Sequence, residues 1–384
     1  MRQPFLVPAV LIPVVLAGGI LFILNGRIGM RDFEVNYTAG DRLAHGETLY
    51  RTTDEHYQFK YSPSSALLYL PLALLPLPIA KVLWFVLILA AVVFSTAVSA
   101  RFAGLPFRQG GGIIFLPGLV LAKYFFREIE LGQINALIMA IFLSMAWFLV
   151  PNGERPTQGR EAAAGLLWGL ATALKPYGVI FLPYFLLKKK WISAVTGTIG
   201  LALSLILPAV SYGFSGNLAV HKEWIQSLSR STPPLLVTQD NVSLLGFLSK
   251  WLGASGAAMA VYGLSTIALA VLMLFVLRKG AWLPHPEPLE IALLLLFIPL
   301  LSPLGWDYTF LSALPAVSLL VTRFRSFPPP AKILLGLDFG LIALTLYDVL
   351  GRPAYALFMS WSVLTICFLS ASLALVFLRG KELV

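Results

Sequence analysis

Cysteine is nearly absent from this chain: Cys367 is the only one in 384 residues. A single cysteine excludes an intrachain disulfide and a cluster of thiolate metal ligands. Histidine is also scarce, and the residues present, His45, His56, His221 and His285, are scattered without an HExxH motif. We therefore expect no metal site.

Two phosphate-binding signatures are missing as well. The chain has no GxxxxGK(S/T) loop and no GxGxxG motif after a strand, the patterns in which glycine-rich loops bind nucleotides. The loops expected on the cytoplasmic side are too short for a separate nucleotide-binding domain. Any activated donor that the protein uses is therefore expected to come from the membrane.

Charged residues are few. They make up 12% of the chain, about half the share in ordinary soluble domains, whereas hydrophobic residues make up 58% and the mean hydropathy is +0.83. These values exclude a soluble globular protein and predict an all-α polytopic membrane protein, with residues 1–384 in one domain. The apolar runs long enough to cross about 30 Å of hydrocarbon are Leu6–Leu24, Ile79–Ala100, Ile134–Val150, Trp191–Val210, Met259–Leu277 and Tyr355–Leu378.

The basic residues predict the orientation of these helices, because short cytoplasmic loops accumulate Lys and Arg. The basic clusters are Arg101/Arg108, Arg155/Arg160, Lys188–Lys190, Arg278/Lys279, Arg323/Arg325/Lys332 and Arg379/Lys381. The same rule explains the net charge of +10 without a nucleic acid partner. With an uncleaved first span at residues 1–24, the loop at 25–62 faces outward, and the chain crosses the cytoplasmic membrane about twelve times.

Two segments between these spans are expected to be irregular. The proline-rich run Pro63–Pro78 should re-enter the membrane or lie at its outer interface. Ala162–Leu187 has basic residues on both flanks, which predicts a hairpin of two short helices with Lys175-Pro176 at its apex. A single kinked span in this place is the alternative, and it would reverse the orientation of the neighbouring helices.

The first outer loop holds the densest charge in the chain. Between Arg27 and Lys60 there are five basic and six acidic residues. Asp32 closely follows the first span, and the residues from Ala39 to Gly46 are typical of a short helix ended by glycine. Asp32 can act as a general base or cap a helix, as aspartate commonly does. The residue type leaves both roles open.

Lys175 would stand where an ammonium group is costly to bury. It either extends to the membrane interface or neutralises an anion in a cavity, and phosphate is the obvious anion at a membrane face. Arg127, Glu128 and Glu130 precede another predicted span and are typical of helix caps and surface charge. Trp306, at the outer end of a span, is the kind of aromatic residue that usually lies in an interfacial belt.

Together these segments resemble glycosyltransferase family 87, the polyprenol-phosphate-mannose-dependent α-mannosyltransferases of GT-C architecture. The matching pieces occur in family order and are short: Asp32-Phe33, Tyr37-x-Ala39-Gly40, Gly46-x-x-Leu49-Tyr50, Phe59-x-Tyr61-x-Pro63, Pro71-Leu72-Ala73-Leu74-Leu75-Pro76, Trp84, Gly132-Gln133-x-Asn135, Ala173-Leu174-Lys175-Pro176, Asn241-x-Ser243-Leu244 and Ser302-Pro303-x-x-Trp306. The resemblance implies a GT-C bundle. In it, 25–62 is an outer catalytic loop with short interfacial helices, 63–310 the family-like core and 311–384 the C-terminal spans.

The resemblance also implies a reaction. Asp32 would be the catalytic base of an inverting transfer of a hexose, mannose in this family, from a polyprenyl-phosphate donor to a lipid or glycan acceptor at the outer face. The donor phosphate and the substrate would be bound by Lys175, Lys60, Arg127, Gln133, Asn135, Tyr61, Trp306 and Tyr308. No cofactor is implied beyond the lipid-linked donor, and the other partners are membrane lipids.

Two positions depart from the family pattern. Tyr308 stands where the family usually has histidine, and Val242 interrupts an Asn-Gln-Ser-Leu motif. Two other classes of protein stay open: a transporter or lipid flippase, and a non-catalytic scaffold of envelope polysaccharide assembly, which the broken motifs favour slightly. Transporters often have paired repeats and charges near the bilayer midplane, whereas here charge gathers at one outer face and no repeat is evident.

Overall fold

The computed structural model describes residues 6–105, 111–150, 155–279 and 286–381. Throughout these ranges every regular element is a helix, which confirms the predicted all-α class. Residues 1–5 of the predicted first span, together with Arg108 and His285, lie outside the described residues.

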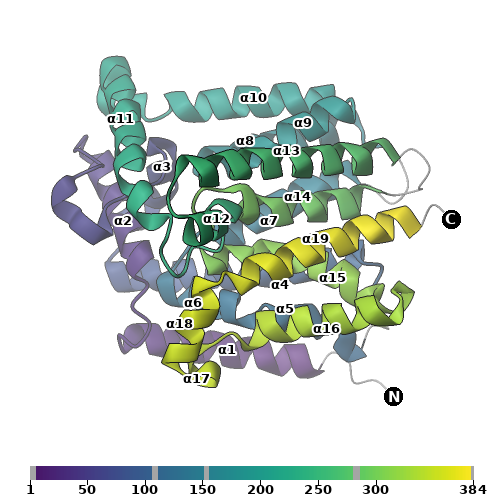
Figure 1. Cartoon of the computed structure of the whole chain (residues 1–384). Helices are drawn as coiled ribbons and strands as arrows, with labels where there is room; N and C mark the ends of the chain where they lie inside the picture. Colours follow the sequence, from purple (N-terminus) through teal and green to yellow (C-terminus); the bar gives the residue numbers. More distant parts are fainter. Residues whose placement is uncertain (1–5, 106–110, 151–154, 280–285, 382–384) are drawn as a thin grey trace.

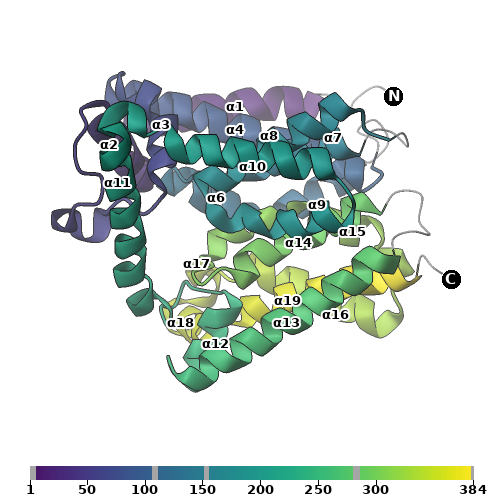
Figure 2. The same ribbon diagram turned by 90° about the horizontal axis from the view of Figure 1, so that it is seen from above.

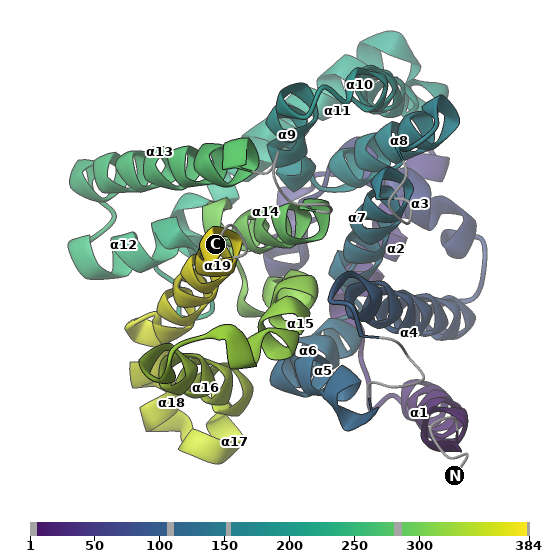
Figure 3. The same cartoon turned by 90° about the vertical axis from the view of Figure 1, so that its right-hand side faces the viewer.

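The long helices run side by side across the molecule (Figure 1) and form a bundle when they are viewed along their axes (Figure 3). These helices are α1 (Leu6–Leu24), α4 (Leu77–Phe102), α7 (Asn135–Leu149), α8 (Gln158–Leu174), α10 (Trp191–Ile206), α13 (Gly256–Lys279), α14 (Glu287–Leu301), α16 (Pro329–Leu344) and α19 (Val363–Lys381). One cluster of buried apolar side chains extends from Ile23 on α1 to Leu378 on α19 and joins them into a single body.

Several other helices gather at one end of this bundle, on the left in Figures 1 and 2. They include α2, α3, α6, α11, α12, α17 and α18. The bounds of the remaining elements are α2 (Arg31–Ala44), η1 (Thr52–Tyr57), α3 (Pro63–Ala73), η2 (Gly111–Phe115), α5 (Leu116–Val120), α6 (Ala122–Leu131), η3 (Pro176–Ile180), α9 (Phe181–Leu187), α11 (Ala209–Ser231), η4 (Pro233–Leu235), α12 (Leu244–Leu252), η6 (Asp307–Ala313), α15 (Leu314–Thr322), η7 (Phe324–Ser326), α17 (Tyr347–Leu350) and α18 (Arg352–Ser360).

The outer faces of the long helices are apolar. On α13, for example, Leu264, Ile267 and Val271 are each more than half exposed. In the described residues three helices, α4, α13 and α19, are both long and apolar enough to cross a membrane. The number rises to five if the bent pairs α6/α7 and α10/α11 each count as one span. The count of about twelve crossings stays a prediction.

The final apolar run differs from its prediction. Tyr355–Leu378 was expected to be one span, but the helix breaks near Ser362, whose φ of 52° is left-handed. The N-terminal part belongs to α18, which has helix α17 before it. Of α18 and α19, α19 is the one long and apolar enough to cross a membrane. The run Trp191–Val210 is also too long, because α10 ends at Ile206 and the chain bends by 92° into α11.

The predicted hairpin around Lys175 is confirmed. Helix α8 ends at Leu174, Lys175 is extended with φ −140° and ψ 125°, and Pro176 starts the short helix η3. The chain then returns along α8, since the ring of Trp168 packs edge-to-face on that of Phe185 with their centroids 5.3 Å apart. Pro63–Pro78 likewise does not form a long span. It contains α3, which packs against α2, and the turn into α4.

The two ends of the bundle give a direct test of orientation. In a Cys367→Ala background, single cysteines at exposed Thr52 and Gln226 are expected to react with a membrane-impermeant maleimide in intact cells. Cysteines at exposed Gln158 and Arg325, near the opposite ends of the helices, should react only after the membrane is permeabilised. The opposite labelling pattern would show that the orientation expected from the basic loops is reversed.

Candidate active site

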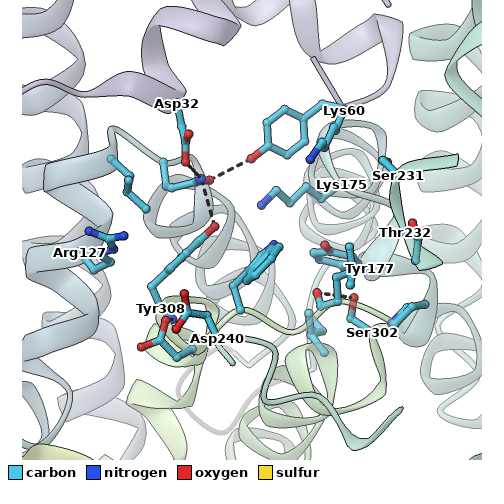
Figure 4. Close-up of a pocket in the computed structure, with 18 of the residues that line it drawn as sticks. Asp32, Lys60, Arg127, Lys175, Tyr177, Ser231, Thr232, Asp240, Ser302 and Tyr308 are labelled. Carbon is cyan, nitrogen blue, oxygen red and sulfur yellow. Dashed lines mark hydrogen bonds between the residues drawn. The ribbon is translucent and has the colours of Figure 1, made fainter. Parts of the chain in front are cut away.

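A large cavity opens at the end of the bundle where the short helices gather (Figure 4). Its volume is about 1930 Å³. Its walls come from the first loop, α6, the turn between α8 and η3, the end of α11 and the segment after α14. Of the predicted site residues, Asp32, Lys60, Tyr61, Arg127, Gln133, Lys175, Trp306 and Tyr308 line this cavity. Asn135 is not among them and lies behind Lys175, whose ammonium group it contacts.

The start of α2 is seated on the end of α6, and this junction positions Asp32. The Met30 N–H donates to the Glu130 carbonyl at 3.1 Å. Gly132 has φ +67°, and a Cβ there would lie 2.7 Å from Phe33 Cβ, so the close approach requires glycine. Asp32 then falls in the first turn of α2, where the helix dipole favours a carboxylate. The capping position is Met30, which makes no side-chain capping bond, so the capping role considered for Asp32 is wrong.

Gln133 connects the carboxylate of Asp32 with two tyrosines. Its Nε2 donates to Asp32 Oδ2 and also to the hydroxyl of Tyr308 at 3.2 Å, while its Oε1 accepts from the hydroxyl of Tyr61 at 2.9 Å (Figure 4). One amide thus joins the first loop to the segment after Trp306. Tyr308 therefore contacts the network directly, at the position where histidine was expected.

The electrostatic environment tunes Asp32 in two opposing directions. Burial raises the pKa of Asp32 above its ordinary value, because a low-dielectric surrounding disfavours the charged carboxylate. The hydrogen bond from Gln133, then the positive charges of Lys175 and Arg127, lower the pKa in part. Burial also lowers the pKa of Lys60, against the effect of Asp32. Asp32 and Lys60 are thus partly desolvated.

Lys175 is held at the cavity by a buried polar chain. Its Nζ donates to Asn135 Oδ1 at 2.7 Å, and Asn135 Nδ2 donates to Glu128 Oε2 at 2.9 Å. The ring centroids of Tyr61 and Tyr177 lie 4.8 and 5.7 Å from the ammonium nitrogen. The side chain therefore points into the cavity and does not extend to the membrane interface (Figure 4).

Glu128 is the most instructive residue that the sequence misassigned. We expected Glu128 to cap a helix and to be a surface charge. In the structure it caps a helix, but its side chain is not exposed. Glu128 is fully buried, and its Oε1 accepts from the N–H of Ala136 in the first turn of α7. The seven-residue spacing from Glu128 to Asn135 was visible in the sequence, but the turn that brings the two side chains together was not.

The motifs Asn241-x-Ser243 and Ser302-Pro303-x-x-Trp306 meet as a structural clasp. Asn241 pairs with Trp306 in an isolated antiparallel bridge, and its Oδ1 accepts from the N–H of Gly305 at 3.0 Å. Val242, the departure from the family motif, donates its backbone N–H to the Gly305 carbonyl at 2.8 Å. A backbone bond does not depend on the side chain, so valine is compatible with the clasp.

The far wall of the cavity carries charges that sequence reasoning did not select. Asp240 and Asp307 lie together there, since the Asp307 N–H donates to the Asp240 carbonyl at 3.2 Å. Lys123 also lines this wall and donates to the Thr345 carbonyl at 2.9 Å. Arg127 pairs with Glu130 at 2.7 Å at its edge. No group of three or more His, Cys, Asp or Glu side chains in the described ranges is arranged to hold a metal ion.

Comparison with known proteins supplies the family. Residues 59–303 match the model of glycosyltransferase family 87. The chain belongs to this family. The matched segment contains Lys60, Gln133 and Lys175. It begins after Asp32 and ends before Trp306, so the family match does not cover these two residues.

Two mycobacterial enzymes are among the relatives of this family 87 protein. It is 25% identical over 278 residues to the polyprenol-phosphate-mannose-dependent alpha-(1-2)-phosphatidylinositol mannoside mannosyltransferase of Mycobacterium tuberculosis (strain ATCC 25618 / H37Rv), covering 67% of this chain and 61% of the relative. It is 25% identical over 345 residues to the corresponding pentamannoside mannosyltransferase of Mycolicibacterium smegmatis (strain ATCC 700084 / mc(2)155), covering 84% of this chain and 77% of the relative. The chain thus spans less than two thirds of the first relative.

A solved structure gives a weaker likeness. The crystal structure of ArnT from Cupriavidus metallidurans bound to undecaprenyl phosphate superposes with a TM-score of 0.46 and 14% sequence identity. The superposition covers 96% of this chain and 77% of that chain.

The raised pKa of Asp32 predicts its titration. The pKa of Asp32 is expected to lie above the ordinary aspartate value of about 4. It is measured from the pH dependence of the infrared carboxyl band that is present in wild type and missing in Asp32→Asn. Gln133→Leu removes a hydrogen bond that favours the ionised form, so it should raise the pKa further. Tyr308→Phe keeps that bond and is the matched control. A wild-type pKa at or below about 4 would contradict this account of the site.

Proposed function

We propose that this family 87 protein transfers a hexose, most simply mannose, from a polyprenyl-phosphate donor to a lipid or glycan acceptor at the outer face of the cytoplasmic membrane. The observation that carries the proposal is the convergence of one partly desolvated carboxylate, Asp32, with the cations Lys175, Lys60 and Arg127 on one large cavity. The printed names of the relatives support the donor and suggest phosphatidylinositol mannosides as the first acceptors to test.

In the proposed reaction Asp32 is the general base. A hydroxyl oxygen of the acceptor attacks the anomeric carbon of the donor while the Asp32 carboxylate takes the hydroxyl proton. The bond between the anomeric carbon and the phosphate oxygen breaks on the opposite face, and polyprenyl phosphate leaves with the electron pair. A single displacement inverts the anomeric configuration, so no second carboxylate is needed as a nucleophile.

The phosphate would be stabilised by side-chain cations. Lys175 is preorganised for this role, because Asn135 and two aromatic rings fix its ammonium group before any anion binds. Lys60 and Arg127 line the same cavity and add positive charge from two other elements. The scheme derives its charge stabilisation from the protein and assigns no step to a cofactor.

The isoprenoid chain of the donor would leave the cavity toward the lipid. The cavity wall formed by η3, α9 and α14 is apolar and includes Val179, Leu182, Pro183 and Ile298. An apolar wall next to a cationic one fits an amphipathic ligand with one charged group. The charges lie at one end of the bundle, which favours a transferase over the transporter class, whose charges lie near the midplane.

Asp32→Asn separates the catalytic role from a structural one. The amide keeps the shape but cannot accept a proton at neutral pH, so we expect transfer from polyprenyl-phosphate mannose to fall by about 10²–10⁴-fold with donor binding retained. Because folding raises the pKa of Asp32, its ionised form lowers stability once the pH exceeds that pKa. The variant should therefore unfold at the same or a higher temperature at pH 7. Asp41→Asn, an exposed change on the same helix, is the control, and a fully active Asp32→Asn would refute the assignment.

Lys175→Ala tests the phosphate contact. We expect kcat/KM for the donor to fall at least tenfold, which corresponds to about 1.4 kcal/mol. The substitution also leaves Glu128 buried without its positive neighbour, which destabilises the fold. The double variant Glu128→Gln/Lys175→Met removes both charges, so it should recover thermal stability while donor use stays low. Wild-type donor kinetics in the double variant would make the lysine purely structural, and exposed Lys222→Ala is the matched control.

A further inference from the structure

Asn36 has an unusual position one helical turn beyond Asp32. It lies on α2, lines the large cavity and is only 1% exposed. Neither its Oδ1 nor its Nδ2 has a hydrogen-bond partner among the described residues. Most buried amides are paired, because an unpaired donor or acceptor destabilises a protein by roughly 1–3 kcal/mol. Two unpaired atoms on one buried side chain at the cavity wall make Asn36 a candidate ligand-binding residue.

The packing of α2 fixes the Asn36 side chain at the cavity wall. Residues four apart lie on one face of a helix, so Asp32, Asn36 and Gly40 share a face. At Gly40 this face is pressed onto α3, where an added Cβ would lie 2.8 Å from the carbonyl carbon of Tyr69. At Asp32 the same face borders the cavity. The Asn36 amide is consequently buried between a helix contact and the base.

We propose that Asn36 binds hydroxyl groups of the hexose that is transferred. The inference rests on the proposed function, in which the hexose lies between Asp32 and the cations that bind its phosphate. An amide donates through Nδ2 and accepts through Oδ1, and a sugar hydroxyl does both, so two neighbouring hydroxyls satisfy both atoms. Asn36 then acts as a specificity residue that reads the sugar beside the reacting carbon.

The other parts of the donor do not match this amide. An ionised phosphate has acceptors but no donor, so it would leave Oδ1 unpaired. An isoprenoid chain offers neither. The hexose is the portion of the donor whose hydrogen-bonding groups complement both unpaired atoms. A group built to bind a hydroxyl also rejects analogues that lack it, since its own polar atoms are then left unpaired.

The test compares two ligands that differ only in the sugar. Purified protein is titrated with polyprenyl-phosphate mannose and with polyprenyl phosphate, and the dissociation constants are measured. Asn36→Leu, which keeps the branching at Cγ and removes both polar atoms, is expected to weaken the mannose-bearing ligand at least about tenfold and the bare lipid phosphate less than about twofold. Its melting temperature should be equal or higher, because the unpaired amide is removed. A structural asparagine would show the opposite change in stability.

Controls and a second variant keep the outcome decisive. Thr38→Ala, an exposed change on α2, should alter neither affinity, and Lys175→Ala should weaken both ligands. If Asn36→Leu does not fold, Asn36→Ala replaces it. A set of singly deoxygenated mannose donors then identifies the hydroxyls: wild type should discriminate against one or two of them, and the Asn36 variant should not.

Each result has one interpretation. Equal affinities of wild type and Asn36→Leu for the mannose donor, or equal losses for both ligands, would overturn the role of Asn36. So would a loss confined to the KM of the acceptor. The proposed function fails by a different result, in which neither ligand binds the wild-type protein. If wild type binds both ligands and Lys175→Ala weakens both, the donor site stands even when the role of Asn36 does not.

Discussion

A glutamate and a lysine are buried at the same end of an apolar bundle, and neither could stay there alone. An isolated buried charge is too costly, whereas a hydrogen-bonded pair of opposite charges is tolerated. Asn135 makes the pairing possible, because its amide accepts from Lys175 and donates to Glu128. This chain of side chains links the broken helix at Lys175, the end of α6 and the first turn of α7.

One short turn serves both halves of the site. Between α6 and α7, Gly132 allows α2 to approach, Gln133 holds Asp32 and Asn135 holds Lys175. Asp32 and Lys175 are thus positioned by residues only two apart in sequence. A change in this turn would displace both together, so their relative geometry is preserved as long as the turn is.

Asp32 differs from the other buried carboxylate in the strength of its partners. Glu128 accepts from a backbone N–H and from an amide that is itself bonded to a lysine. Asp32 accepts from Gln133 and makes no ion pair within the described ranges, although several cations surround it. A carboxylate with a neutral partner and a raised pKa can still take a proton, as a general base must. On the same face of α2, Asn36 has an amide donor and an amide acceptor without partners among the described residues.

The sequence by itself determined the class of protein, the polar first loop, the hairpin at Lys175 and the family. Hydropathy, prolines and ordered motifs are local patterns, and local patterns can be read directly from the sequence. It could not separate Asp32 as a base from Asp32 as a cap, nor could it assign Glu128 to the interior. It also joined α18 and α19 into one span, because the left-handed residue Ser362 has no distinctive sequence signal.

Only the tertiary structure decided which polar groups meet. Asp32 and Gln133 are 101 residues apart in the sequence. Lys60, Lys175 and Tyr308 come from three further segments and line the same cavity. It also removed Asn135 from the cavity wall and placed it behind Lys175. The physical reason is that burial, pairing and pKa depend on neighbours from other helices, and no periodicity along the chain records which helices will adjoin.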